Sequence, residues 1–207
     1  MADSLGIVIL AAGKGTRLRT DVPKAICPIQ GTTLVDRVLR NLQEFATHAN
    51  LEFSASLVTG HKREAVEAKV SENWEKVKFA YQAEQKGTAH ALQTYFEQIE
   101  GAWDKDFTLV VCADTPLIGS AEYSRLYKEA VEGGHDGVAA VFDTPAPTGY
   151  GRIVPGGKGF SIVEEKDAND EERKIKTVNS GLYLIKTSHI KKHLSSIDDS
   201  NKSGEFY

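Results

Sequence analysis

Two glycines, an arginine and a lysine lie close together near the N-terminus, in the stretch LAAGKGTRLRTDVPK at 10–24. Gly13 and Gly15 allow the backbone to approach a ligand closely, and successive N–H groups in such a loop form an anion-binding concavity. Arg17 can take two phosphate oxygens at once, and Lys24 adds a second positive charge. The pattern therefore predicts a loop that holds a nucleoside triphosphate.

The loop differs from two common phosphate-binding motifs. The P-loop pattern GxxxxGK[ST] is absent, and GKGTRL lacks the third glycine of the dinucleotide-binding fingerprint. A glycine pair alone would indicate only a flexible connection with solvated lysines. Here the whole pattern G-x-G-T-R, followed by P-K, comes directly after the apolar run at 5–10. Because open α/β sheets bind ligands at the carboxyl ends of their strands, this context favours phosphate binding.

A carboxylate, Asp114, closes a second apolar run, FTLVVCAD at 107–114. At the end of a strand opposite a phosphate loop, it is well placed to hold Mg²⁺ against phosphate oxygens. The alternative is an aspartate that only caps the turn before Thr115 and Pro116. The position favours the metal role, and residue chemistry alone leaves both open.

Gln82 and the pair Gly87-Thr88 lie where a strand-like run gives way to a helical one. A side-chain amide offers both a donor and an acceptor, which suits the edge of a pyrimidine base. The Thr88 hydroxyl could equally cap the N-terminus of the helix. The two interpretations are compatible.

Strand-like and helical runs alternate over the first two-thirds of the chain. Apolar strands are predicted at 5–12, 53–60, 77–82 and 107–114, and helices at 32–46, 61–72, 87–101 and 120–134. Thr33 followed by Asp36 suits the start of the first helix. This alternation predicts an α/β fold, with a mostly parallel central sheet covered by helices on both faces.

The pattern of predicted strands and helices changes after Asp136. Strand-like runs at 136–143, 150–166 and 176–186 follow one another without long helices between them, and PGGKG at 155–159 is typical of a hairpin. We expect this part to extend the sheet and to build a second wall of the site. A short helix is expected at 189–197. Its two histidines, His189 and His193, have a zinc-binding spacing, but the lysines between them favour a solvated face.

Composition narrows the class of protein. With 207 residues, 41% hydrophobic and 26% charged, the chain is typical of one globular domain. A net charge of −4 argues against nucleic-acid binding, although a local basic cluster can still hold a small anion. There is no run of about 18 apolar residues that would span a membrane. The start lacks a basic region typical of a signal peptide, and two separated cysteines, Cys27 and Cys112, make no disulfide framework, so a cytoplasmic location is expected.

Several motifs together resemble a known family. LAAGKGTRL…DVPK is similar to the signature of the sugar nucleotidyltransferases, which couple a nucleoside triphosphate to a sugar 1-phosphate. YQAEQKGTAHAL, ADTPLI, PTGYGRIV, SIVEEKDANDEERKI, VNSGLYL and SGEFY resemble, in order, the uridyltransferase domain of the bacterial N-acetylglucosamine-1-phosphate uridyltransferase (GlmU) family. The resemblance covers 7–207. It implies a Rossmann-like, GT-A-like three-layer α/β/α fold. It also implies Mg²⁺-dependent synthesis of UDP-N-acetylglucosamine and pyrophosphate from UTP and N-acetylglucosamine 1-phosphate, for peptidoglycan and lipopolysaccharide precursors.

The resemblance also implies a division of the chain. A nucleotide-binding part at 1–135 would precede a sugar-binding part at 136–207. Catalysis would fall to Arg17 and Lys24, with Mg²⁺ on Asp114. The nucleotide would be contacted by Lys24, Ala113 and the backbone of Leu10, Ala11, Ala12 and Gly13, and its uracil by Gln82, Gly87 and Thr88.

The sugar would be bound by the Gly151 backbone and by the Glu164 and Asn179 side chains. From the residues alone, Glu164 lies in a charge run that could be a solvated loop, and Asn179 before Ser-Gly could simply form a turn. The family usually has a tyrosine and a glycine where this chain has Cys112 and Ala113, so the fit to substrate is expected to differ.

The family also places an asparagine ligand of Mg²⁺ and a β-helix acetyltransferase domain beyond the segment that matches SGEFY. The sequence ends at Tyr207, so no acetyl transfer, weakened uridyl transfer and a monomer are expected of it. Two alternatives stay open. One is a nucleotidyltransferase for another nucleoside triphosphate or sugar 1-phosphate, and the other is a module that binds a UDP-sugar without turning it over.

Overall fold

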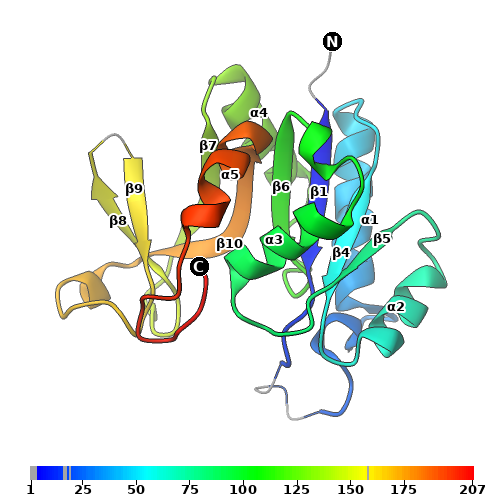
Figure 1. Cartoon of the computed structure of the whole chain (residues 1–207), viewed down its shortest axis with the longest axis horizontal. Coiled ribbons are helices and arrows are strands. Elements are labelled where there is room, and N and C mark those ends of the chain that lie inside the picture. The colour runs from blue at the N-terminus through cyan, green and yellow to red at the C-terminus, as the bar shows by residue number, and fades with distance from the viewer. Residues whose placement is uncertain (1–3, 16–17, 19, 158) are drawn as a thin grey trace.

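A mixed eight-stranded sheet forms the centre of the molecule in the computed structural model, which describes residues 4–15, 18, 20–157 and 159–207 (Figure 1). Its parallel part has the order β5-β4-β1-β6. These strands are β1 (Leu5–Leu10), β4 (Ala55–Thr59), β5 (Lys78–Tyr81) and β6 (Phe107–Cys112). The predicted parallel core is confirmed.

The sheet continues beyond β6 with antiparallel pairs. β10 (Thr177–Lys186) pairs with β6, with β7 (Gly137–Asp143) and with β8 (Arg152–Gly156). β8 and β9 (Gly159–Val163) form the hairpin predicted from PGGKG. Figure 1 shows this hairpin standing away from the parallel strands, on the far side of β10.

Helices cover both faces of the sheet. α1 (Leu34–His48), α2 (Arg63–Ser71) and α4 (Ser120–Glu132) pack on one face, and α3 (Thr88–Gln98) and α5 (Thr187–His193) pack on the other. The alternation of side chains along a strand explains both layers, because Ile7 and Ile9 of β1 join the first cluster while Val8 joins the second. The three-layer α/β/α fold class is confirmed.

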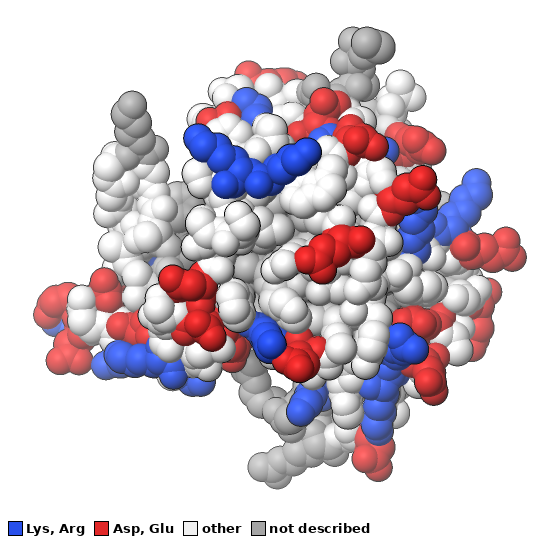
Figure 2. Space-filling model, in the orientation of Figure 1, with Lys and Arg blue, Asp and Glu red and all other residues white. Residues whose placement is uncertain are grey.

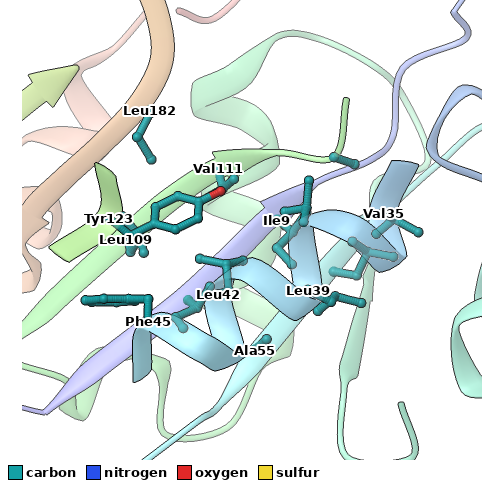
Figure 3. Packing of buried hydrophobic residues seen from close by; sticks show 14 of the residues in the cluster. Ile9, Val35, Leu39, Leu42, Phe45, Ala55, Leu109, Val111, Tyr123 and Leu182 are labelled. Atoms are coloured by element: carbon teal, nitrogen blue, oxygen red, sulfur yellow. The ribbon is translucent and has the colours of Figure 1, made fainter. Parts of the chain in front are cut away.

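The larger core cluster lies between α1, α4 and the sheet. Leu39, Leu42 and Phe45 of α1 point toward Ile9 and Tyr123, as Figure 3 shows, and all five side chains are buried. This face of α1 is the apolar stripe predicted from the helical spacing.

The start of α1 also follows its prediction. The Thr33 hydroxyl accepts a hydrogen bond from the Asp36 backbone N–H at 3.2 Å. The Asp36 carboxylate in turn accepts hydrogen bonds from the Thr33 hydroxyl and from Trp74 Nε1, each at 2.9 Å. The cap therefore holds a buried carboxylate without leaving it unpaired.

Shorter elements complete the fold. They are β2 (Pro28–Ile29), β3 (Thr32–Thr33), and the 3₁₀ turns η2 (Lys24–Ile26), η3 (Ala102–Asp104), η4 (Glu172–Lys174) and η5 (Leu194–Ser196). None of the helices that the structure describes has the length and apolarity needed to cross a bilayer. Figure 2 shows acidic and basic side chains interspersed over one face of the molecule.

Candidate functional site

A first cavity of about 450 Å³ opens at the carboxyl ends of β1 and β6. Six of its lining residues were predicted from sequence as nucleotide or metal contacts: Leu10, Ala11, Gly13, Lys24, Ala113 and Asp114. The remaining lining residues are Gly15, Leu18, Ala25 and Cys112. Two segments distant in sequence therefore form one pocket, because β1 and β6 are neighbouring parallel strands.

Lys24 and Asp114 form an ion pair in this cavity, between Lys24 Nζ and Asp114 Oδ2. About a third of each side chain is exposed, at 35% for Lys24 and 33% for Asp114, so a ligand can reach both. The turn after β6 is closed by Thr115, whose hydroxyl donates to the Cys112 carbonyl at 2.8 Å. Among the described residues, Thr115 thus closes this turn, while the Asp114 carboxylate pairs with Lys24.

The glycine loop packs closely against Lys24. Gly15 has φ +60°, and a Cβ at this position would lie 2.8 Å from Lys24 Cβ. A residue with a side chain would have to move the lysine, so the glycine serves both the turn and the position of the cation. Arg17, the second predicted catalytic residue, lies outside the described residues.

A second, larger cavity of about 860 Å³ lies between α3, β6, β10 and the C-terminal segment. Thr88, Glu164 and Asn179 line it, as predicted for base or sugar contacts. Cys112 lines both cavities, which places the junction of the two at the end of β6. Burial raises the pKa of the Cys112 thiol to about 11, so this group is neutral at physiological pH.

Both polar and apolar residues line the second cavity. The polar ones are Thr88, Glu164, Asp167, Asn179, Ser200, Asn201 and Tyr207. The apolar ones include Ala89, Leu92, Val110, Ile162, Val163, Ile185, Leu194 and Ile197. Such a cavity suits a ligand that carries hydroxyl or amide groups together with apolar surface.

Glu164 and Asp167 are the two carboxylates that line this cavity, and Glu164 is half-buried rather than fully solvated. Burial raises the pKa of its carboxyl, and the nearby Asp167 and Glu205 carboxylates raise it further. A Cβ at Gly151 would lie 2.9 Å from Glu164 Oε1. The missing side chain at Gly151 therefore makes room for the carboxylate.

Asn179 both forms a turn and lines the cavity. Its Oδ1 accepts a hydrogen bond from the Gly181 N–H at 3.1 Å, and its Nδ2 donates to Tyr183 Oη. Its own backbone N–H donates to the Gly151 carbonyl at 2.9 Å. The turn interpretation and the binding interpretation are therefore compatible.

Gln82 is 3% exposed and outside the described linings of both cavities. Its Nε2 lies 3.3 Å from the Gly87 carbonyl, to which it donates, and 2.9 Å from His90 Nδ1. Both contacts use the amide nitrogen, which leaves Oε1 as the side-chain atom with capacity to accept a hydrogen bond. Ala12 is likewise buried, at 5% exposure, and is not among the residues described as lining the first cavity.

Gly87 is the N-cap residue of α3, so the prediction that Thr88 caps this helix is wrong. The helix start is closed instead by the C-terminal segment: Ala89 N–H donates to the Phe206 carbonyl at 2.9 Å, and Phe206 N–H donates to the Lys86 carbonyl at 2.6 Å. Gly87 has φ +116°, and a Cβ there would lie 2.3 Å from the Phe206 oxygen. In Figure 1 the end of the chain comes to lie beside α3.

A comparison with family models decides the class of this site. The model for the MobA-like NTP transferase domain matches residues 7–173. The chain belongs to this family. It is therefore a nucleotidyltransferase, in which the loop after β1 and the carboxylate after β6 face one another across the first cavity.

Curated relatives of this nucleotidyltransferase confirm the resemblance seen in the sequence. The chain is 34% identical over 202 residues to the bifunctional protein GlmU of Clostridioides difficile (strain 630), which covers 97% of this chain and 42% of that protein. It is 37% identical over 204 residues to the bifunctional protein GlmU of Streptococcus pyogenes serotype M12 (strain MGAS2096), which covers 97% of this chain and 46% of that protein. The chain thus spans less than half the length of these relatives.

Two solved structures share the fold of the nucleotidyltransferase. UDP-glucose pyrophosphorylase complexed with UDP-glucose superposes with a TM-score of 0.71 at 21% identity, over 98% of this chain and 83% of that one. A putative glucose-1-phosphate thymidylyltransferase from Bacillus anthracis gives a TM-score of 0.71 at 16% identity, over 91% of this chain and 75% of that one. At these identities the likeness shows the fold.

Metal binding by the described part of the nucleotidyltransferase depends on how its His, Cys, Asp and Glu side chains are grouped. No cluster of three or more His, Cys, Asp or Glu side chains that could hold an ion is found among the residues that the structure describes. His189 and His193 have ring centroids 6.4 Å apart on α5, where His189 is half-buried and His193 is exposed. A single carboxylate such as Asp114 fits Mg²⁺, which takes one or two protein carboxylates and completes its shell with phosphate oxygens and water.

Three residues near the site had not been singled out from sequence. Arg152 and Glu165 form an ion pair beside Val163 and Glu164 of the second cavity, and Phe206 contacts the start of α3. Arg152 carries a weak signal, because it is a charged residue beside the apolar pair Ile153-Val154. Phe206 carries none, since its contacts join segments far apart in the chain.

Proposed function

We propose that this nucleotidyltransferase transfers uridylyl from UTP to N-acetylglucosamine 1-phosphate, giving UDP-N-acetylglucosamine and pyrophosphate. One observation carries the proposal: two cavities of different chemistry meet at Cys112. The first offers a cation and a glycine-rich backbone for phosphates, and the second offers Glu164 and Asn179 for sugar groups. The GlmU relatives support a sugar nucleotide as product.

The reaction needs no covalent intermediate on the protein. A phosphate oxygen of the sugar phosphate attacks the α-phosphorus of UTP, and the bond from that phosphorus to the pyrophosphate oxygen breaks. Lys24 neutralises the negative charge that develops on the leaving pyrophosphate, and backbone N–H groups near Gly13 hold the phosphates. The shared wall at Cys112 brings the two substrates together, which lowers the entropic cost of the encounter.

We also propose that the enzyme uses Mg²⁺. Asp114 would hold the ion, because its carboxylate is one-third exposed and lines the phosphate cavity. When bound, the ion supplies charge neutralisation for the phosphate oxygens. Lys24, already beside this carboxylate, supplies the neighbouring fixed charge.

Base selection is assigned to Gln82, Gly87 and Thr88. With the Gln82 nitrogen directed at the Gly87 carbonyl and His90, its oxygen can accept the N–H of a uracil ring. Cytosine presents an acceptor at the same ring position, so this orientation favours UTP over CTP. We place the reaction in the cytoplasm, as the free cysteines Cys27 and Cys112 favour.

The test is pyrophosphate release by this chain with Mg²⁺, N-acetylglucosamine 1-phosphate and each common nucleoside triphosphate in turn. We expect release with UTP, reduced on the order of 10²–10³-fold in Lys24→Ala. Lys69→Ala, which removes an exposed ion pair on α2, is the matched control and should keep full activity. Release with a different triphosphate, or binding of the UDP-sugar with no release at all, would overturn the proposal.

A further inference from the structure

Arg152 pairs in register with Val163, which lines the second cavity, and is 1% exposed although it carries a full charge. Its Nη2 donates to Glu165 Oε2 at 2.6 Å, and its Nη1 donates to the Tyr150 carbonyl. Glu165 Oε2 also accepts the Gly149 N–H at 3.1 Å. The pair therefore forms hydrogen bonds with the backbone of one turn at two successive residues, Gly149 and Tyr150.

Several neighbours of this pair line the second cavity or contact residues that do, and a further neighbour, Arg173, has its Nε 3.9 Å from Glu165 Oε1. Gly151 follows the turn at 149–150, and its carbonyl accepts a hydrogen bond from the Asn179 N–H at 2.9 Å. Glu164 immediately precedes Glu165 and lines the cavity. One ion pair thus connects the turn before Gly151, the strand that carries Asn179 and the loop that carries Glu164.

We propose that Arg152 and Glu165 are positioning residues for the sugar phosphate: they hold Gly151, Glu164 and Asn179 in the arrangement that binds it. The inference rests on the proposed function for the identity of the ligand. Arg152 does not itself contact the ligand, because its two terminal nitrogens are directed at Glu165 and Tyr150.

Stability alone is a poor reason for this pair. Burying the Arg152 charge costs free energy. Its partner Glu165 keeps 29% of its side chain exposed, so solvent screens the attraction and the pair adds little to stability. Arg152 Nε is also buried without a hydrogen-bond partner among the described residues, so the guanidinium is incompletely satisfied. The benefit that remains is that the ion pair fixes the positions of the residues that line the cavity.

Another ion pair of the same loop is much more exposed. Lys174 and Glu171 pair at 2.6 Å with 69% and 82% of their side chains exposed. Their contact lies within η4 and its preceding residue, and neither lines a cavity among the described residues. Lys174 and Glu171 therefore provide a matched control, because they carry the same charges and lie in the same loop but form no described hydrogen bond or ion pair with the turn at 149–150.

The kinetic test compares KM for the two substrates in Glu165→Gln, Arg152→Lys and the control Lys174→Gln. Displacing binding groups by about 1 Å costs up to roughly 10²-fold, so we expect KM for the sugar phosphate to rise about 10-fold to 100-fold in the first two variants. KM for the nucleoside triphosphate should change less than about twofold, since the first cavity is unaffected. Equal changes in both KM values, or none, would overturn the inference.

A double variant separates positioning from stability. Arg152→Met with Glu165→Leu removes both charges, and such replacements are often tolerated by the fold. We expect it to unfold at a temperature close to that of the parent chain and to keep the raised KM for the sugar phosphate, because the bonds to Gly149 and Tyr150 are lost. A folded double variant with the parent KM would refute the positioning role.

Hydrogen exchange tests the geometry without any turnover. In Glu165→Gln we expect faster exchange of the amides at 149–151 and 179, while amides of β1 and β6 keep the parent rates. Unchanged exchange at 149–151 would overturn the inference even for an active enzyme. Changed exchange in a protein that releases no pyrophosphate would support the inference and contradict the proposed function.

Discussion

The two parts of the sheet are held together differently. In the parallel part, β1, β4 and β6 are buried nearly throughout, and apolar side chains pack on both faces. In the antiparallel part, β7 and β9 consist of exposed and half-buried residues. Large apolar side chains such as Val141, Phe142 and Phe160 remain 40–47% exposed there.

In the antiparallel part, outside the apolar core, specific polar contacts stabilise the structure. The Arg152–Glu165 pair fixes the turn before Gly151, and the Ser180 hydroxyl donates to the Ala140 carbonyl at 2.7 Å to support the irregular stretch of β10. The difference indicates that the phosphate cavity sits on a rigid core, whereas the second cavity depends on a few specific hydrogen bonds. Substitutions in the two parts should therefore affect different properties.

The largest effect on stability is expected in the parallel part. Leu39→Ala removes a fully buried side chain from the core of α1 and should lower the free energy of unfolding by about 2–5 kcal/mol. The Phe160 residue of β9 is 47% exposed, so Phe160→Ala should change the free energy of unfolding by about 0.5 kcal/mol or less. Urea denaturation of both variants measures the contrast. Equal losses would show that the antiparallel part has a core of its own.

A smaller effect is expected where the C-terminal segment joins the two parts. Gly87→Ala introduces a side chain at φ +116° and against the Phe206 carbonyl, which should cost about 1–3 kcal/mol and displace the segment. Gly134→Ala is the control, because Gly134 has φ +68° but nothing within 4 Å of a new Cβ. Hydrogen exchange of Ala89, whose N–H the segment covers, should rise in Gly87→Ala only. Similar exchange in both variants would show that the backbone strain, not the contact, matters.

The smallest effect is a pair of opposite pH dependences at neighbouring residues. The hydrogen bond from Arg152 lowers the pKa of Glu165, whereas burial raises the pKa of Glu164. Stability from Glu165 is present above the ordinary glutamate pKa of about 4.3 and is lost as the pH falls through the lowered value. Stability linked to Glu164 is present below about 4.3 and is lost as the pH rises through the raised value.

Urea denaturation from about pH 3 to about pH 7 measures both contributions. Glu165→Gln should reduce the loss of stability on acidification, and Glu164→Gln should reduce the loss as the pH rises. Lys174→Gln, again on the same loop, should alter neither profile appreciably. The same sign of change for both glutamates would contradict the assignment of burial to one and of an ion pair to the other.

Much of the parallel part follows from local patterns. Continuous apolar runs predicted β1, β4 and β6, and the spacing of Leu39, Leu42 and Phe45 predicted α1. The loop with Gly13 and Lys24 and the carboxylate Asp114 were predicted to share a site because parallel strands end at the same edge. The cap on α3 was predicted wrongly, because the Thr88 hydroxyl was the candidate, whereas Gly87 is the N-cap residue. The backbone partner at this helix start, Phe206, comes from the other end of the chain.

The sequence by itself determined which segments become strands and helices, where the phosphate loop lies and which residue types could meet a nucleotide and a sugar. Only the tertiary structure decided that Lys24 pairs with Asp114, that Cys112 joins two cavities and that Arg152 is buried against Glu165. The physical reason is the separation along the chain over which each kind of interaction acts. Periodicity and capping act between near neighbours in the chain, whereas these contacts depend on the order of strands in the sheet and on desolvation.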